Sequence, residues 1–491
     1  MKNVFSTSFS KIKRLKKPLG IALLVLIAIS FAFFIKEGGV KSGVTILLAI
    51  LAPMIVYSIA TNAKFGIIIL ISLPFFINWI LRMNLTSFPL GTVMDGLQAL
   101  LILGMFIRQK YEPDWSIFKS PISIMIIVWI AYNFLQFINP TAESRLAWLY
   151  TIRSVAIVML TYFIFSYNIR SVSFIRLIIK IWLGLSFFAA CYAFKQQHIG
   201  FFGFEEAYLY SDPIIMDLLF IGGEWRKFSI FSDPVTFSYN MIIASILCLG
   251  LMFGPVSRAK KVILFFLICF FLMNMLYSGT RSAFILFPAA LILLVILVFN
   301  KKMVFFAGVA TVFIMFLIYV PTSNLALYRF QTAFKPSNDA SFNVRAINQK
   351  RIQPFIQTHP LGGGLGSTGI WGVKFSPGSF LASFPPDSGY VRVAVELGWL
   401  GLLLFCILMF IILKTGINNY YLIKDPELKS YCLAMVLIVF AINIGNYPQE
   451  ALVQFPANIY FYLITALINI TYRIDKEYQE KIHMPEDKVL H

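Results

Sequence analysis

The sequence predicts an all-α polytopic membrane protein with about 12–14 transmembrane helices. Composition is the first indication, since 59% of the 491 residues are hydrophobic and only 13% are charged. The mean hydropathy of +0.80 is the second, because a water-soluble domain of this size would need a far more polar surface. The third is a series of apolar runs of near-spanning length. The short alternating segments of a membrane β-barrel do not occur in the sequence.

The first apolar run, residues 19–35, follows a basic segment with five cations between Lys11 and Lys17. This layout is similar to a secretory signal, but the run is too long and lacks a small-x-small cleavage site. We therefore predict an uncleaved first span with a cytoplasmic basic flank. The further runs are residues 43–60, 65–81, 92–107, 121–138, 149–167, 174–194, 234–253, 262–278, 282–299, 303–320, 389–413, 431–447 and 452–472. The run that holds Pro74 and the run that starts near Val93 could be re-entrant, which would leave about twelve spans.

The net charge of +19 does not indicate nucleic-acid binding, because the cations cluster in short segments between apolar runs. Such clusters orient the spans and contact anionic lipid headgroups. If the N-terminus is cytoplasmic and the spans alternate, most basic clusters share the cytoplasmic side. They contain Lys64, Arg108, Lys110, Lys119, Arg170, Arg258, Lys260, Lys261, Lys301, Lys302, Lys414, Lys424, Lys429, Arg473, Lys476 and Lys481. The positive-inside rule requires this grouping, so we also expect a cytoplasmic C-terminus.

The same alternation places residues 196–232, 278–281 and 321–388 on the opposite side of the membrane. The last segment is very long for a connection between two spans, which indicates either function or disorder. It contains Trp371, many phenylalanines and helical patterning over residues 344–355, so we predict a folded, functional loop. The expected organisation is transmembrane helices over 1–320, a large extracytoplasmic loop over 321–388, and C-terminal transmembrane helices with a tail over 389–491.

No metal site, disulfide or cofactor is predicted. The five cysteines lie inside apolar runs without a close pair, which is typical of small buried side chains. Residues 364–369 formally match GxGxxG, but the strand, helix and acidic residue of a dinucleotide fold are missing, and so is the Gly-Lys-Ser/Thr of a P-loop. Two interpretations remain for Gly364 and Gly366. They form a tight turn that allows close backbone approach, or their amides bind a phosphate or glycan oxygen.

Two arginines are candidates for binding an anion at the membrane surface. Arg281 opens a span in the turn SGTRSA, and Arg345 lies in the long loop with Lys350 and Arg351 as possible helpers. A guanidinium in such a position can bind a diphosphate through paired hydrogen bonds. The alternative is that each side chain only reaches lipid headgroups. The predicted topology places both arginines on one side of the membrane, next to the glycine run.

Asp387, in PPDSGY, is a candidate base, because a partly desolvated carboxylate near arginines could accept a proton from a sugar hydroxyl. It could instead cap the helix that follows. Glu396 could bind glycan or pair with Arg392 four residues earlier. His359 could act as a base or make only surface hydrogen bonds.

The order of these motifs resembles the O-antigen ligase and Wzy-type polysaccharide polymerase superfamily. The resemblance covers residues 231–413 and rests on SGTRSA, the Arg345 segment, PLGGGLG and ELGWLG. It implies a GT-C-like inner-membrane glycosyltransferase with a periplasmic active face, which transfers glycan from undecaprenyl diphosphate without a metal. By this resemblance, Arg281 and Arg345 hold the diphosphate. Asp387 stands where typical ligases have a histidine, which favours a polymerase or a divergent ligase.

The expected function is therefore a polysaccharide polymerase, with an O-antigen ligase acting on lipid A-core as the alternative. Further candidate contacts to diphosphate or glycan are Arg351, Lys350, Gly364, Gly366, His359 and Glu396. Acidic residues among aromatics in 196–232, such as Glu205 and Asp212, could bind sugar hydroxyls or form a solvated interfacial helix. A chain-length regulator is an expected partner. A lipid-linked glycan flippase or transporter is the rival from another class, although no internal repeat is evident.

Overall fold

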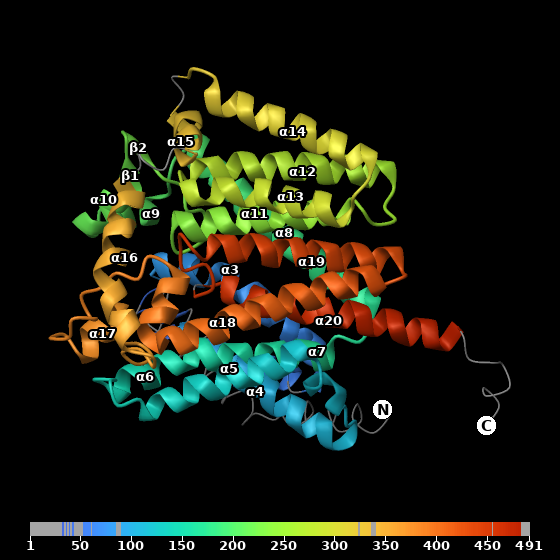
Figure 1. Cartoon of the computed structure of the whole chain (residues 1–491), viewed down its shortest axis with the longest axis horizontal. Coiled ribbons are helices and arrows are strands. Elements are labelled where there is room, and N and C mark those ends of the chain that lie inside the picture. Colours follow the sequence, from blue (N-terminus) through green and yellow to red (C-terminus); the bar gives the residue numbers. More distant parts are fainter. Residues whose placement is uncertain are drawn as a thin grey trace.

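The computed structural model is a bundle of long helices lying side by side (Figure 1). It describes residues 53–59, 61–84, 90–322, 325–334, 340–453 and 455–482, with a few isolated positions before residue 53. The predicted spans at 19–35 and, for the most part, 43–60 lie outside the described residues, as does the basic N-terminal flank.

In the described part of the chain, nine helical segments are long and apolar enough to cross a membrane. They are α3 (Ala63–Arg82), α4 (Leu90–Tyr111), α5 (Pro121–Leu135) with η2 (Gln136–Ile138), α6 (Arg145–Ile152) with η3 (Arg153–Ile157) and α7 (Thr161–Asn168), α8 (Val172–His198), α11 (Pro234–Leu251), α12 (Arg258–Tyr277), α18 (Gly389–Leu422) and α19 (Pro426–Gly445). The all-α polytopic class is therefore confirmed. The two runs considered re-entrant form α3 and α4, which are both of spanning length.

Three further apolar helices run beside these nine (Figure 1). They are α13 (Leu286–Leu297), which follows the short helix η4 (Arg281–Ile285), then α14 (Lys301–Tyr319) and α20 (Ala457–Ile482). The remaining elements are η1 (Trp115–Phe118), α9 (Gly203–Leu209), α10 (Pro213–Leu219), α15 (Leu325–Ala333), α16 (Ala340–Thr358), α17 (Gly369–Phe375) and a hairpin of β1 (Phe220–Ile221) and β2 (Glu224–Trp225).

Polar caps and prolines determine where several helices begin. The side chains of Ser120, Asp233 and Asp425 accept hydrogen bonds from first-turn amides of α5, α11 and α19, and a proline follows each of them. The cap satisfies amides that have no partner within the helix, and proline fits the first turn because it needs no donor there. These signals divide long apolar stretches into separate helices.

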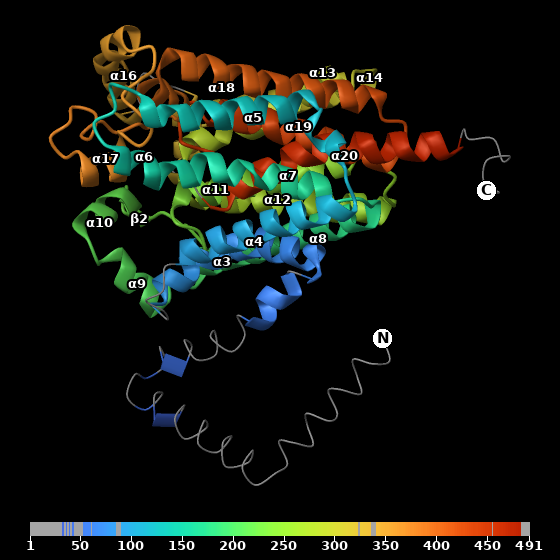
Figure 2. The ribbon, with the colours of Figure 1, turned by 90° about the horizontal axis from the view of Figure 1, so that it is seen from below.

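The most buried helices are α11, α19 and α20. Of the spanning window in α11, 94% is buried, against 22% in α12. Figure 2 shows α11 and α20 between a layer of α3, α4 and α8 and a layer of α5 and α18. Outer helices such as α14 expose large apolar side chains, including Phe305 and Val312. A surrounding hydrocarbon phase explains both features, since lipid tails are as apolar as the protein core.

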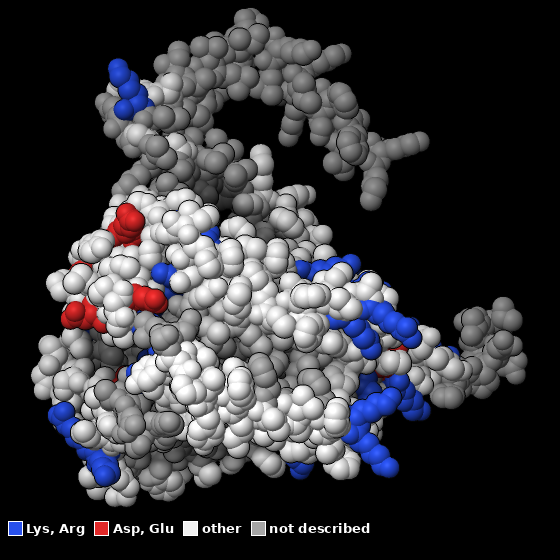
Figure 3. Space-filling view, turned by 90° about the horizontal axis from the view of Figure 1, so that it is seen from above, with Lys and Arg blue, Asp and Glu red and all other residues white. Residues whose placement is uncertain are grey.

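The two ends of the bundle differ in charge. Lysines and arginines gather at the end where α20 projects from the bundle, whereas acidic side chains lie toward the other end (Figure 3). Residues 196–232, which include α9 and α10, lie at the more acidic end (Figure 1). The turn at 278–281 and the described part of 321–388, which includes α16 and α17, lie at the same end. This grouping is the one that the predicted alternation requires.

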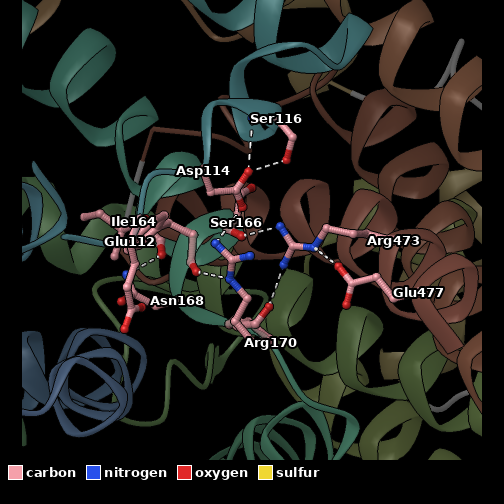
Figure 4. Close-up of polar contacts among 11 residues, drawn as sticks. Glu112, Asp114, Ser116, Ile164, Ser166, Asn168, Arg170, Arg473 and Glu477 are labelled. Atoms are coloured by element: carbon pink, nitrogen blue, oxygen red, sulfur yellow. Dashed lines mark hydrogen bonds and ion pairs between the residues drawn. The ribbon is translucent and has the colours of Figure 1, made fainter. Parts of the chain in front are cut away.

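A polar network fastens the basic end (Figure 4). Arg170 forms a salt bridge with Asp114 at 2.6 Å, and Arg473 of α20 donates to the carbonyls of Ser166 and Ile169, each at 2.8 Å. Charged groups at hydrogen-bonding distance give stronger interactions than neutral ones. The network therefore ties α20 to the end of α7 and to the segment before α5.

Candidate functional site

The segment between α14 and α18 contains three helices and a glycine loop that enters a break in α18. At Gly398 the backbone of α18 leaves helical geometry, with φ at 72°. The carbonyls of Val395 and Glu396 accept hydrogen bonds of 2.9 Å from the amides of Gly363 and Gly364. In return, the Leu400 amide donates to the Pro360 carbonyl at 3.3 Å. The loop thus satisfies backbone groups that the break would leave without partners.

Glu396 anchors this loop through its side chain. That side chain is buried, with 2% of the residue exposed, and accepts from the Gly366 amide at 3.0 Å and from the Thr368 hydroxyl. It also pairs with Arg392 at 3.2 Å, as one of the two predicted alternatives states. Arg392 also forms a salt bridge with Glu450 at 2.7 Å, which links the loop to the segment after α19.

The glycines are required by close packing. Gly364 and Gly366 have φ of 95° and 81°, a region that other residues rarely adopt. A Cβ at Gly364 would lie 2.4 Å from the Ala142 side chain, and one at Gly366 would lie 2.3 Å from the Thr151 hydroxyl. Their amides already donate within the protein. The structure therefore agrees with the tight-turn interpretation, and these two amides are not directed at a ligand.

Beside this scaffold is a cavity of about 650 Å³ that contains three arginines. Arg281 comes from the start of η4, Arg345 from α16, and Arg226 from the segment after β2. The other lining residues are Ile221, Val235, Gly279, Thr280, Ser282, Ile285, Leu286, Ala346, Gln349, Ile444, Tyr447, Pro448 and Gln449. Two of the predicted site residues, 64 positions apart in sequence (345 minus 281), thus line one cavity.

The turn before η4 holds Arg281 in place. Gly279 has φ of 61°, and the Thr280 amide donates to the Ser278 hydroxyl at 3.1 Å. Arg345 is positioned by the packing of α16 against α18, where Ile352 and Val395 are fully buried in one apolar cluster. Both arginines are half-buried, so their charges lie partly out of water beside the cavity.

Asp387 does not cap α18. Ser388 is the capping residue, and its hydroxyl accepts from the Val391 amide. The carboxyl group of Asp387 instead lines a narrow crevice together with Arg345 and Asn348. Burial raises its pKa, while the nearby Arg345 charge and a hydrogen bond with Asn348 act in the opposite direction. The structure thus brings the third predicted site residue next to Arg345.

Asp387 also lines a second pocket, of about 200 Å³, with Asp233, Tyr239 and Glu450. Burial raises the pKa of Glu450, and the negative charges of Glu396 and Asp387 add to this while Arg392 opposes it. This acidic pocket adjoins the arginine cavity, because Val235 and Gln449 line both. The arginine cavity and the acidic pocket are therefore next to each other.

The other predicted contact residues do not reach the arginine cavity. Lys350 and Arg351 are exposed on α16, and the Arg351 guanidinium lies 5.3 Å from the ring centre of Phe380. His359 stacks on Phe355 with ring centres 4.0 Å apart, and its Nδ1 is 2.9 Å from the Phe355 carbonyl oxygen. It lines a separate pocket of about 190 Å³, which also includes Gly364.

Two acidic residues of 196–232, Glu205 and Asp212, have structural partners. Glu205 is fully buried and accepts from the Gln196 amide group at 2.6 Å, and Asp212 caps α10. Neither Arg226, Asp233 nor Glu450 was predicted as a site residue. Only the predicted topology indicated Arg226, since it placed residues 196–232 on the same side as Arg281. Asp233 caps α11 and Glu450 pairs with Arg392. Sequence alone does not show whether such residues also line a functional site.

Comparison with known proteins supports the motif-based resemblance. A comparison with curated proteins found no match. Residues 263–406 match a protein-family model described as O-antigen ligase. The matched segment contains Arg281, Arg345, Asp387 and the glycine loop, whereas Arg226 and Glu450 lie outside it. Over residues 263–406, the chain is therefore similar to the O-antigen ligase family, which agrees with the resemblance to the O-antigen ligase and Wzy-type polymerase superfamily.

Proposed function

We propose that the protein is an inner-membrane glycosyltransferase that polymerises undecaprenyl diphosphate-linked glycan at the periplasmic face. The observation that carries this proposal is that the arginine cavity, lined by Arg281 and Arg345, adjoins the acidic pocket, lined by Asp387. The match of residues 263–406 to the O-antigen ligase family model supports glycan transfer as the class of reaction. In this proposal the basic end of the bundle and both chain termini are cytoplasmic, as the positive-inside rule favours.

The arginine cavity binds the diphosphate of the donor. A guanidinium donates two parallel hydrogen bonds to phosphate oxygens, and this pairing strengthens where water is partly excluded. The diphosphate becomes the leaving group, so positive charge fixed beside it lowers the barrier to its departure. Arg281 and Arg345 supply this charge, and the reaction is expected to proceed in the presence of a metal chelator.

The acidic pocket binds the acceptor sugar. Asp387 accepts the proton of the attacking hydroxyl, and its raised pKa makes it a stronger base than an aspartate with the ordinary pKa. Because the arginine cavity and the acidic pocket share Val235 and Gln449, donor and acceptor meet where they adjoin. Holding both reactants in this way replaces a bimolecular encounter by a positioned one.

The polymerase is favoured over a ligase by Asp387, which stands where typical ligases have histidine. The acceptor is then a second lipid-linked glycan, and a chain-length regulator is a partner. In the ligase alternative the acceptor is lipid A-core. Size analysis of the product separates the two, because a polymerase gives a ladder of repeats on lipid diphosphate and a ligase gives glycan on lipid A-core.

A flippase or transporter is the rival function. Transporters place ionisable groups near the membrane midplane, whereas here the candidate groups lie at one end of the bundle. Vesicles containing the protein should extend lipid diphosphate-linked glycan supplied on the periplasmic side, without ATP. Movement of the lipid between leaflets with no new glycosidic bond would show that the enzyme proposal is wrong.

A further inference from the structure

Arg226 lies in the arginine cavity but outside the segment that matches the family model. It follows the β1–β2 hairpin, and its backbone amide donates to the Leu219 carbonyl at 2.8 Å. The side chain reaches across to the turn before η4. There its Nε donates to the Ser278 carbonyl at 2.8 Å, and one terminal nitrogen donates to the Thr280 hydroxyl at 3.0 Å. The other terminal nitrogen donates to the Leu218 carbonyl at 3.3 Å, which leaves one N–H on each terminal nitrogen for a ligand. Arg226 is therefore held beside Arg281 by the same turn that positions Arg281.

The charge of Arg226 has no carboxylate partner at salt-bridge distance among the described residues. Burial lowers its pKa to about 10, with the positive charges of Arg329 and Arg281 adding to the effect and Asp233 opposing it. Gathering cations in a half-buried cavity is unfavourable unless an anion binds there. An anionic ligand in this cavity would therefore pair with the charge of Arg226.

A third arginine in the cavity suits the charge of the leaving group better than the charge of the intact donor. A diphosphate that links a lipid to a sugar is a diester with two negative charges. When the bond from the anomeric carbon to the phosphate oxygen breaks, its electron pair stays on that oxygen, and the acceptor oxygen bonds to the carbon. The acceptor proton passes to Asp387, and the diphosphate monoester carries a third charge above its last pKa of about 6. Arg226 places a further positive charge in the cavity where this third negative charge develops.

We propose that Arg226 is a third catalytic arginine, which binds the lipid diphosphate more tightly as its third negative charge develops. The proposal rests on the glycosyltransferase function above and extends it to a residue outside the family segment. An interaction that strengthens toward the transition state raises kcat, whereas one that is equal in the ground state changes only KM. A purely structural Arg226 would not distinguish monoester from diester.

Two measurements on the full-length protein in detergent or nanodiscs test this assignment. The first is binding at pH 8 of undecaprenyl diphosphate, and of the same lipid carrying one N-acetylglucosamine on its terminal phosphate. The wild-type protein should bind the first lipid at least about tenfold more tightly, consistent with about 1.4 kcal/mol for one additional charged contact. Arg226→Gln should remove most of this preference, and Arg226→Lys should keep part of it. Arg258→Gln removes the same charge at the opposite end of the bundle and should keep the preference in full.

The second measurement is steady-state transfer. Arg226→Gln should lower kcat by about 10²-fold or more with a much smaller change in KM, as expected for a lost anion-stabilising donor. Unchanged kcat, or equal loss of monoester and diester binding, would overturn the assignment. Should Arg226→Gln fail to fold, equal affinity of the wild-type protein for both lipids would still overturn it. Absence of transfer by the wild-type protein would instead contradict the proposed function, so the two failures are distinguishable.

Discussion

At the scale of single residues, the structure removes one of the two roles predicted for Asp387. Ser388 caps α18, so Asp387 is free of the capping role, and its carboxyl group faces Arg345 and Asn348. Burial of a carboxyl group disfavours its charged form and raises its pKa. A carboxylate with a raised pKa is a stronger base, which suits it to accept a proton from a sugar hydroxyl.

Substitution of Asp387 tests this role directly. Asp387→Asn should lower transfer by about 10²–10⁴-fold, the usual contribution of a general base, while Asp387→Glu should retain measurable activity. In the wild-type protein, kcat/KM should fall as pH drops through the raised pKa of Asp387, because protonation removes the base. This acid limb should therefore lie above the ordinary aspartate value of about 3.9. Equal activity of the Asn and Glu variants would rule out the base.

The sequence predicted three residues that meet at the site, Arg281, Arg345 and Asp387, because residue type and membrane side were both readable from it. It did not predict Arg226 as a member. A single arginine that follows a short hairpin carries no motif, and only the folded turn brings it next to Arg281. Glu396 was readable as an ion-pair partner of Arg392, but its hydrogen bonds to the glycine loop depend on tertiary structure.

At the scale of elements, the glycine loop is a scaffold that holds α18 in a broken form. Its amides donate hydrogen bonds to carbonyls of α18 next to the break at Gly398. Its glycines pack against the segment before α6 and against α6 itself. The sequence indicated a tight turn, yet it could not place that turn in a helix break. An apolar run of 25 residues, 389–413, reads as a continuous span, and the break requires a partner from elsewhere in the chain.

Gly366→Ala should destabilise this scaffold. The new Cβ would lie 2.6 Å from the Ala147 carbonyl oxygen, at a φ of 81° that alanine rarely adopts. Backbone strain of this kind costs on the order of 1–3 kcal/mol, so thermal unfolding in detergent should shift to lower temperature. Gly378→Ala is the matched control, because a Cβ added at Gly378 would have no other atom within 4 Å. A shift of equal size in both variants would mean that the loop is not a packed scaffold.

At the scale of the whole molecule, the arrangement follows from charge and hydropathy. Apolar helices form the bundle, basic segments gather at one end, and the candidate site lies at the other (Figures 1 and 3). These features were predictable because each depends on local composition. The order of packing was not predictable, since α11 and α12 are both apolar enough to span a membrane but differ greatly in burial. Which of them is central depends on the contacts of the complete fold.

The central claim is that Arg281 and Arg345, distant in sequence, together hold a lipid diphosphate. The most direct test is glycan transfer by Arg281→Ala and Arg345→Ala variants that are matched to wild type for protein level and membrane insertion. Each substitution should lower transfer by at least about 10²–10³-fold, because a preorganised donor to the leaving group is lost. Arg258→Gln, at the opposite end, should retain full activity. Transfer that survives in both alanine variants would contradict the diphosphate site.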